Sequence, residues 1–231
     1  LEVVDPATGV RHVVATCVQL AWGCDVDAER MRSFDWSPDG VTIAYTNYRG
    51  VGTVDVRTRH LTSLFDEGAG RPASPTWSPD GQTIAFEYGV PYQGQYVGVL
   101  REIQSIGRDG SERRRLSGSP EPESIGFSSP TWSADGTRIV YLGSDAWKDT
   151  GWALRVMAID LIDGAPVGSP RSLVDLGTAY CLGFCPTVTL SPDGQSVLID
   201  DGDHLVVAPI DGTEGRSLPV NARPMAWRPI P

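Results

Sequence analysis

Short runs of alternating apolar and polar residues, each of strand length, cover most of the chain, and a five-residue turn motif recurs between them. The motif is Trp-Ser-Pro-Asp-Gly at 36–40 and 77–81, Trp-Ser-Ala-Asp-Gly at 132–136 and Leu-Ser-Pro-Asp-Gly at 190–194. Proline favours the second position of a type I turn, and glycine favours the left-handed position that closes it. Each copy therefore predicts the end of one strand and the start of the next.

The residues after each motif predict a second strand, because they are rich in β-branched and aromatic residues and show no helical period. These second strands begin near Val41, Gln82, Thr137 and Gln195. Two further runs follow in each repeat, joined by turns such as Asp109-Gly110 and Asp163-Gly164. An Asp-Gly pair between alternating runs is a strong hairpin signal. Four antiparallel strands per repeat are typical of a β-propeller blade.

The repeats recur roughly every 40 to 60 residues and predict one all-β domain over 1–231. The expected blades cover residues 31–65, 71–117, 127–175 and 186–219. Residues 1–15 match a third and fourth strand, and 220–231, which contain Trp227-Arg-Pro, match a first strand. We therefore expect a five-bladed β-propeller of four-stranded antiparallel blades, closed by a composite blade from both termini. The second strand of that blade is unaccounted for: either the blade has three strands, or residues before Leu1 have been removed.

Charge and hydropathy exclude several classes of partner. The net charge is −10, with 19 basic and 29 acidic residues. Since non-specific nucleic-acid affinity comes from a basic surface, and anionic lipid also attracts basic segments, we expect no nucleic-acid partner. No apolar run approaches the length of a membrane span, so we expect no membrane insertion. The chain begins with Leu1, which indicates a processed or trimmed protein.

The Trp-Ser-Pro-Asp-Gly turn, the Ile-Ala-Tyr or Ile-Ala-Phe strand after it and the Arg-Arg-Leu-Ser ending resemble the TolB-like β-propeller repeat of bacteria. Four copies and two end fragments cover nearly the whole chain. The resemblance implies a propeller that binds proteins or ligands, often outside the cytoplasm. The same repeat also precedes the hydrolase domain of prolyl-oligopeptidase-like peptidases. A fold does not fix a function.

The four cysteines form two local pairs, each in a segment that leads into the first strand of a blade. They are Cys17 with Cys24 and Cys181 with Cys185. In a family that is often exported, an even count in close pairs favours two disulfides and an oxidising, extracytoplasmic location. Two pairs of free thiols and a four-cysteine zinc site are the alternatives, although the first spacing is wide for a zinc knuckle.

Candidate catalytic residues are few. The three histidines, His12, His60 and His204, lie in or beside predicted outer hairpins, where a surface role is expected. There is no Gly-x-Ser-x-Gly nucleophile motif and no His-Glu-x-x-His zinc motif. We therefore expect no catalytic site and no cofactor. Two acidic segments are expected to be plain turns, and a calcium site is the alternative for each. They contain Asp200, Asp201 and Asp203, and Asp25, Asp27 and Glu29.

Every sizeable insertion falls on one predicted face. In a propeller, the connections from strand four to the next strand one, and from strand two to strand three, share a face, which we call the insertion face. The motif turns lie on the opposite face, the turn face. The insertions are residues 16–31, 88–99, 144–152 and 177–186. Rigid scaffolds present binding residues on such segments, and aromatic side chains make good anchors.

The motif tryptophans 36, 77, 132 and 227 are expected to be core residues. The candidate binding residues on the insertion face are Trp22, Tyr92, Trp147, Tyr180 and Phe184. The alternative is that these aromatics only cover the insertions that carry them. We expect a monomer that binds a protein or a small-molecule or glycan ligand without catalysis. Two other functions stay open: the gating propeller of a peptidase, and a carbohydrate-binding or carbohydrate-active propeller.

Overall fold

The structure, a computed structural model, describes eleven stretches of the chain. They are residues 1–5, 7–14, 33–67, 70–93, 97–117, 126–148, 151–179, 187–200, 205–211, 213 and 215–218. All regular secondary structure in these stretches is β-strand. They contain no helix of the length and apolarity needed to cross a lipid bilayer.

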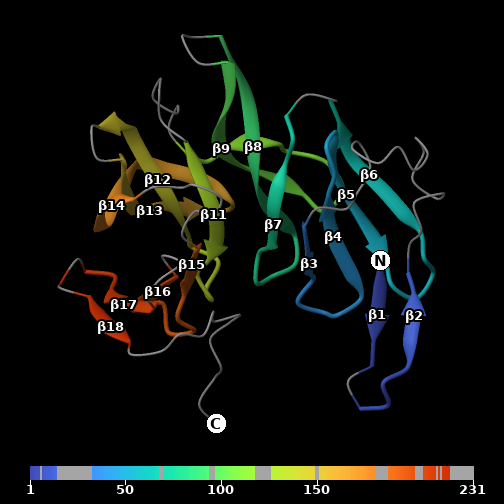
Figure 1. Ribbon diagram of the computed structural model, residues 1–231. Coiled ribbons are helices and arrows are strands. Elements are labelled where there is room, and N and C mark those ends of the chain that lie inside the picture. The colour runs from blue at the N-terminus through green and yellow to red at the C-terminus, as the bar shows by residue number, and fades with distance from the viewer. Residues whose placement is uncertain are drawn as a thin grey trace.

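Four antiparallel sheets of four strands each follow one another along the chain, as predicted (Figure 1). The first blade contains β3 (Ser33–Trp36), β4 (Thr42–Thr46), β5 (Gly50–Asp55) and β6 (Leu61–Asp66). The second contains β7 (Ala73–Trp77), β8 (Thr83–Gln93), β9 (Val97–Gly107) and β10 (Arg114–Arg115). The third contains β11 (Phe127–Trp132), β12 (Arg138–Lys148), β13 (Gly151–Ile162) and β14 (Ala165–Ala179). The fourth contains β15 (Thr187–Leu190), β16 (Ser196–Asp200), β17 (Leu205–Pro209) and β18 (Arg216–Leu218).

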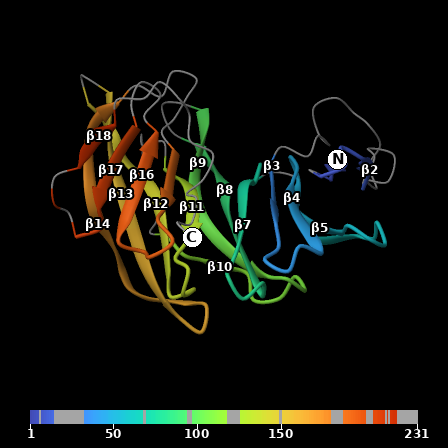
Figure 2. The same cartoon turned by 90° about the horizontal axis from the view of Figure 1, so that it is seen from below.

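The four blades lie side by side in an arc, because their first strands contact one another in order: β3 with β7, β7 with β11 and β11 with β15. A two-stranded sheet of β1 (Glu2–Val4) and β2 (Arg11–Val13) lies beside the first blade, at the opposite end from the fourth (Figure 2). No described strand links this small sheet to the fourth blade. The predicted fifth, composite blade also needs residues 220–231, which lie outside the described stretches.

The repeated turns are built alike. The last residue of each first strand pairs with the same position of the second: Trp36 with Ile43, Trp77 with Ile84, Trp132 with Ile139 and Leu190 with Val197. The motif glycines have φ of 68°, 67°, 71° and 69°, the left-handed conformation that the sequence predicts. In each turn the serine hydroxyl donates to the aspartate at 2.5–2.6 Å. This bond holds the turn in shape.

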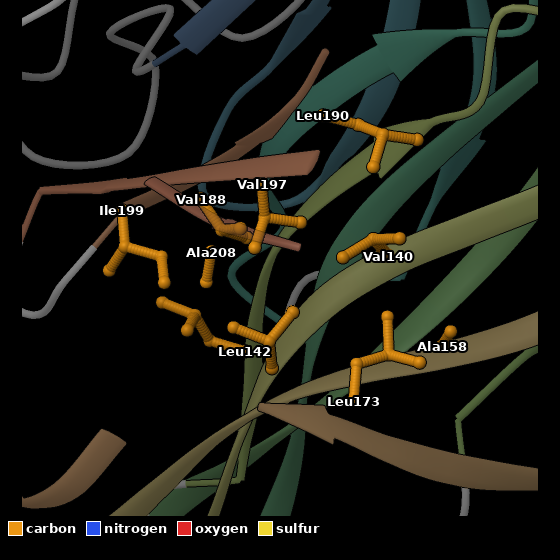
Figure 3. Packing of buried hydrophobic residues seen from close by; sticks show 10 residues of the cluster. Val140, Leu142, Ala158, Leu173, Val188, Leu190, Val197, Ile199 and Ala208 are labelled. Atoms are coloured by element: carbon orange, nitrogen blue, oxygen red, sulfur yellow. The ribbon is translucent and has the colours of Figure 1, made fainter. Parts of the chain in front are cut away.

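The hydrophobic core lies between neighbouring blades. Trp77 packs with Ala44 and Val51 of the first blade, and Trp132 packs with Ala85 and Ile103 of the second. Leu190 takes the same place in the cluster between the third and fourth blades, to which Val140 and Leu142 of the third blade also belong (Figure 3). These three side chains are 5%, 9% and 7% exposed. Each motif residue thus packs on the second and third strands of the preceding blade.

Trp36 is the exception, and its assignment to the core was wrong: it is 40% exposed, and its neighbour Phe34 is 57% exposed. The sheet that precedes β3 has only two described strands, so Trp36 lacks the neighbours that cover Trp77 and Trp132. The small sheet instead packs on the second and third strands of the first blade, where Leu1 and Val3 contact the cluster that includes Ile43.

Candidate binding face

Two blades are lengthened at the insertion face. In the first blade, β4 ends at Thr46. In the second, β8 passes the equivalent position, Glu87, and continues to Gln93, paired throughout with β9. The added stretch is about 20 Å long at a typical strand rise. In the third blade, β12 continues to Lys148 in the same way. All of this added length lies at one end, because the turn-face ends of the four second strands remain in register.

These extensions were expected to be loops, and that interpretation was wrong. Residues 88–93 and 97–99 belong to β8 and β9, and 144–148 and 151–152 belong to β12 and β13. Alternating apolar residues such as Val97 and Val99 favour a strand, whereas the extra length of the insertion alone does not distinguish a strand from a loop. The candidate residues Tyr92 and Trp147 therefore stand on strands. Tyr92 pairs with Gly98, and Trp147 pairs with Trp152 near the end of its hairpin.

An arginine fixes the base of the β8–β9 hairpin to the first blade. The Arg113 guanidinium lies 4.0 Å from the ring centre of Phe65 and 4.4 Å from that of Tyr88. It donates to a Glu67 carboxylate oxygen at 2.6 Å and to the Gln104 side-chain oxygen at 2.7 Å. The Tyr88 hydroxyl donates to the other Glu67 oxygen at 2.6 Å. The cluster joins β6 of the first blade to β8, β9 and the start of β10.

Electrostatics in this cluster favour the ion pair. Hydrogen bonding from Arg113, followed by that from Tyr88, lowers the pKa of Glu67. Burial, with the nearby Glu67, raises the pKa of Tyr88. The Arg113 side chain is only 21% exposed, although it lies next to the outer strand β10. Tyr88, the first residue of the predicted insertion 88–99, is buried. Sequence reasoning missed this cluster because its members come from two different blades.

A polar seam joins the first strands of three blades at their insertion-face ends. The buried Glu87 carboxylate accepts hydrogen bonds from the Ser74 hydroxyl at 2.7 Å and from the Ser129 backbone N–H at 3.0 Å. Arg101 pairs with its other oxygen at 3.1 Å. The Ser74 backbone N–H donates to the Ser33 hydroxyl oxygen of the first blade at 2.8 Å. With both oxygens engaged, Glu87 serves to join blades, and it is poorly placed to act as a general acid or base.

Ser74 and Ser129 occupy equivalent positions, and both have positive φ, 49° and 53°. Each precedes a proline and lies where the pairing of its strand with the next shifts register. The irregularity turns the Ser129 backbone N–H toward the preceding blade. Such left-handed non-glycine residues cost about 1–3 kcal/mol and persist where surrounding contacts impose them.

Most of the predicted site falls outside the described stretches. This holds for Trp22, Tyr180 and Phe184 and for all four cysteines, Cys17, Cys24, Cys181 and Cys185. It also holds for the acidic segment at 25–29 and for Asp201 and Asp203. The structure therefore places two of the five candidate aromatics, Tyr92 and Trp147, on separate hairpins of the same face.

Two cavities lie on the opposite side of the molecule, at the turn face. Two neighbouring hollows, of about 440 and 760 Å³, lie between the second and third blades and share Gln82, Thr83, Asp163 and Gly164 in their walls. The turn aspartates Asp80 and Asp135 line the larger one. Each has a lowered pKa, with the hydrogen bond from its turn serine as the largest cause, and the pKa of Asp135 falls to about 2. Both carboxylates therefore accept hydrogen bonds that stabilise their own turns.

Of the three histidines, His204 lies outside the described stretches. His12 and His60 are exposed, on β2 and beside β6 respectively, as expected for surface residues. Within the same stretches, no three side chains among histidine, cysteine, aspartate and glutamate form a group that would hold a metal ion.

Comparison with known proteins supports the fold. No protein-family model matches the sequence, and no curated protein matches it. Among solved structures, TolB from Acinetobacter baumannii matches with a TM-score of 0.63 and 19% identity over 94% of this chain and 48% of its own. The chain thus spans about half the length of that protein.

Two enzymes match equally well. An oligogalacturonate lyase in complex with manganese matches with a TM-score of 0.64 and 16% identity, over 93% of this chain and 58% of its own. A puromycin-hydrolyzing peptidase from Mycobacterium tuberculosis has a TM-score of 0.64 and 17% identity, over 91% of this chain and 33% of its own. At such identities the likeness concerns the fold alone. The chain has the all-β, four-stranded-blade fold that TolB shares with these propeller proteins.

Proposed function

We propose that this chain is a non-catalytic binding propeller whose insertion face holds a protein or a small-molecule or glycan ligand. The observation that carries the proposal is the one-sided lengthening of the second and third blades. Two paired hairpins rise from the insertion face, whereas all four turn-face ends keep the short motif turn. Tyr92 and Trp147 stand near the ends of these hairpins, and Trp22, Tyr180 and Phe184 complete the proposed contact set.

The fixed base of one hairpin supports this function. Arg113 links the β8–β9 hairpin to Glu67 and Phe65 of the first blade. A preorganised hairpin loses less conformational entropy on binding than a free loop, so more of the contact energy appears as affinity. The seam around Glu87 has its carboxylate oxygens engaged, which favours binding over turnover.

We propose a monomeric five-bladed ring that works outside the cytoplasm, with disulfides Cys17–Cys24 and Cys181–Cys185 stiffening the insertion face. Its partner is neither a nucleic acid nor a membrane, because the net charge is −10. We propose no cofactor for it.

Two alternatives follow from the similar structures. The likeness to a peptidase supports a gating propeller joined to a hydrolase domain, and the likeness to a lyase supports a carbohydrate-active propeller. Both enzymes are longer than this chain, which covers 33% and 58% of them. Hydrolysis of a peptide substrate, or cleavage of oligogalacturonate, by the purified chain would favour these alternatives over the binding propeller.

The test screens the full chain against a glycan array and a random-peptide phage library and then measures each hit by calorimetry. We expect Tyr92→Ala and Trp147→Ala to weaken the retained ligand at least tenfold, with the melting temperature unchanged within about 2 °C. The control is Ile162→Ala, which removes an apolar side chain at the turn face that is 64% exposed. A ligand that responds to Ile162→Ala and ignores both hairpin variants would place binding at the turn-face hollows and contradict the proposal.

A further inference from the structure

A turn-face hollow between the second and third blades has walls of polar residues. It is the smaller of the two cavities there, with a volume of about 440 Å³. Its walls include Thr83, Ser105, Gly107 and Arg114 of the second blade and Asp163 of the third, and we call it the Arg114 hollow. No described residue in these walls has an apolar side chain. A cavity of this volume takes a small molecule, and these walls suit a polar one.

The hollow exists because the junctions on the two sides of the second blade are closed differently. At the first junction the β9–β10 turn lies against the first blade: a Cβ atom on Gly110 would be 3.1 Å from the Leu64 carbonyl oxygen on β6. At the second junction the β13–β14 turn stands free, since no described atom beyond its chain neighbours lies within 4 Å of a Cβ on Gly164. The outer strand β10 has only two residues there, whereas β6 has six. The space beside the short strand therefore stays open.

The third blade shows which side chains occupy the same position on its own face. At the turn-face end of β12 and β13, Arg138 pairs with Asp160. The Asp160 carboxylate accepts hydrogen bonds from the Arg138 guanidinium at 2.7 Å and from the Arg171 guanidinium on β14 at 3.5 Å. Hydrogen bonding from Arg138 is the largest cause of a lowered pKa at Asp160. One carboxylate thus lies between two guanidinium groups.

The second blade keeps one arginine at this place and has no carboxylate between two guanidinium groups. At the positions of Arg138, Asp160 and Arg171, in that order, it has Thr83, Gly107 and Arg114. Glycine has no side chain, so the position that corresponds to Asp160 becomes part of the hollow. Arg114 donates to Glu112 through Nη2 at 2.7 Å, and its other two nitrogens have no described partner. A ligand carboxylate beside Arg114 would take the place that Asp160 has in the third blade.

Two hydroxyl groups without a described partner lie on the same face as Arg114. Ser105 is 2% exposed and pairs with Arg114 on one side and with Ala85 on the other. Thr83, two residues before Ala85 on β8, shares this face because alternate residues of a strand point the same way. The face is turned toward the third blade, since Ala85 packs in one cluster with Trp132. A buried hydroxyl that makes no hydrogen bond costs stability, so a ligand that accepts its bond is favoured.

The walls also contain charges of both signs. The charged residues are Arg108, Arg114, Asp109, Glu112 and Asp163. Asp163 lies in the β13–β14 turn, on the other wall from Arg114, and its carboxylate has no described partner. A purely anionic ligand would meet three carboxylates, and a purely cationic one would meet two guanidinium groups. A ligand that carries one charge of each sign is complementary to both walls.

We propose that the Arg114 hollow binds a free amino acid, a small zwitterion with a carboxylate and an ammonium group. The ligand carboxylate accepts hydrogen bonds from Arg114 and from the hydroxyls of Thr83 and Ser105, and the ammonium group pairs with Asp163. Hydrogen bonds that involve charged groups are about twice as strong as those between neutral groups. The site lies on the opposite face from the contact set of the proposed function, so it is a second binding function that does not depend on the first.

Calorimetry with the full chain tests the class of ligand. The probes are the standard amino acids, and the controls are propionate and propylamine, each of which carries only one of the two charges. We expect at least one amino acid to bind with a Kd below about 1 mM, and both controls to bind at least about tenfold more weakly. The proposal is wrong if no amino acid binds in this range, or if either control binds as tightly as the best amino acid.

Single substitutions test the position of the ligand. Arg114→Gln and Asp163→Asn should each weaken the best amino acid at least about tenfold, because each removes one charged partner. The control is Arg115→Gln at the next residue of β10, which pairs with Gln104 and lies on the other face of the sheet. All three side chains are exposed, so the melting temperature should stay within about 2 °C. Unchanged affinity in Arg114→Gln, or an equal loss in Arg115→Gln, would overturn the proposal.

The hairpin variants separate this site from the insertion face. Tyr92→Ala and Trp147→Ala should leave the affinity for the amino acid unchanged, because both residues lie on the hairpins of the insertion face. A tenfold loss in either variant would assign the amino acid to the insertion face and overturn this inference. An insertion-face ligand that ignores both variants would contradict the proposed function alone.

Discussion

The two ends of each blade differ in how uniform they are. At the turn face the four motif turns share one register, one glycine conformation and one serine–aspartate hydrogen bond. At the insertion face the blades differ in length: β4 stops at Thr46, whereas β8 continues to Gln93 and β12 to Lys148. The conformation at the turn face depends on contacts within the five residues of the motif. The conformation at the insertion face depends on contacts between blades.

The chemistry of the motif turn therefore repeats in every described blade, whereas the polar contacts at the insertion-face junctions differ from one junction to the next. The Arg113 cluster joins residues from the first and second blades and has no described counterpart at the next junction. Changes at the insertion-face junctions should therefore have larger and more specific effects than changes at the turns.

The largest effect is expected at Gly70, which lies where the first blade meets the β8 hairpin. A Cβ atom on Gly70 would collide with the Tyr88 ring, which is buried and held by Glu67. We expect Gly70→Ala to lower the free energy of unfolding by about 3 kcal/mol in urea titrations, because the packed ring has to move.

The matched control is Gly164→Ala in the turn between β13 and β14. No atom lies within 4 Å of the added Cβ, and only the positive φ of 71° opposes the change. Its expected cost is about 1 kcal/mol. If both variants lost the same free energy of unfolding, the junction at Gly70 would tolerate an added methyl group as well as the turn at Gly164 does.

An intermediate effect is expected from two adjacent arginines. Arg113→Ala removes contacts with two rings and two hydrogen bonds, so the free energy of unfolding should fall by about 2 kcal/mol. Arg114→Ala removes one exposed ion pair with Glu112 and should cost about 0.5 kcal/mol or less. Thermal and urea unfolding of both variants would measure the difference, and a larger loss for Arg114→Ala would refute the assigned role of Arg113.

The smallest effect concerns pH at a turn. The pKa of Asp135 is lowered from 3.8 to about 2, first by the Ser133 hydroxyl and then by bonds from Thr137. The folded form thus gains stability from this carboxylate above about pH 4 and loses it as the pH falls toward 2. Asp135→Asn should flatten that part of the stability curve between pH 4 and 2. An unchanged acid slope would mean that other carboxylates dominate.

Much of the fold could be predicted from the sequence because the turn motif is local. Pro38, Asp39 and Gly40 suffice to predict where one strand ends and the next begins, and the same logic holds at each copy. The turn at Asp163-Gly164 also has the expected conformation, with positive φ at both residues. Once the turns are placed, the lengths of the alternating apolar and polar segments on either side predict which consecutive strands pair.

The site was less predictable because it depends on neighbours distant in sequence. Nothing near Arg113 indicates that Phe65 will lie under its guanidinium. Similarly, Trp36 has the same local sequence as Trp77, and only the preceding sheet makes one exposed and the other buried. Surplus length at Tyr88–Val99 predicted an insertion correctly, but its identity as a paired hairpin depends on the partner strand.

The backward direction of the hydrogen bonds between blades has a consequence for how the chain assembles. Ser74 and Trp77 donate to acceptors on the first blade, and Ser129 and Trp132 donate to the second. During synthesis from the N-terminus, each new blade therefore meets a completed template that already presents its acceptors. Folding can therefore advance blade by blade, in the order in which the blades are synthesised.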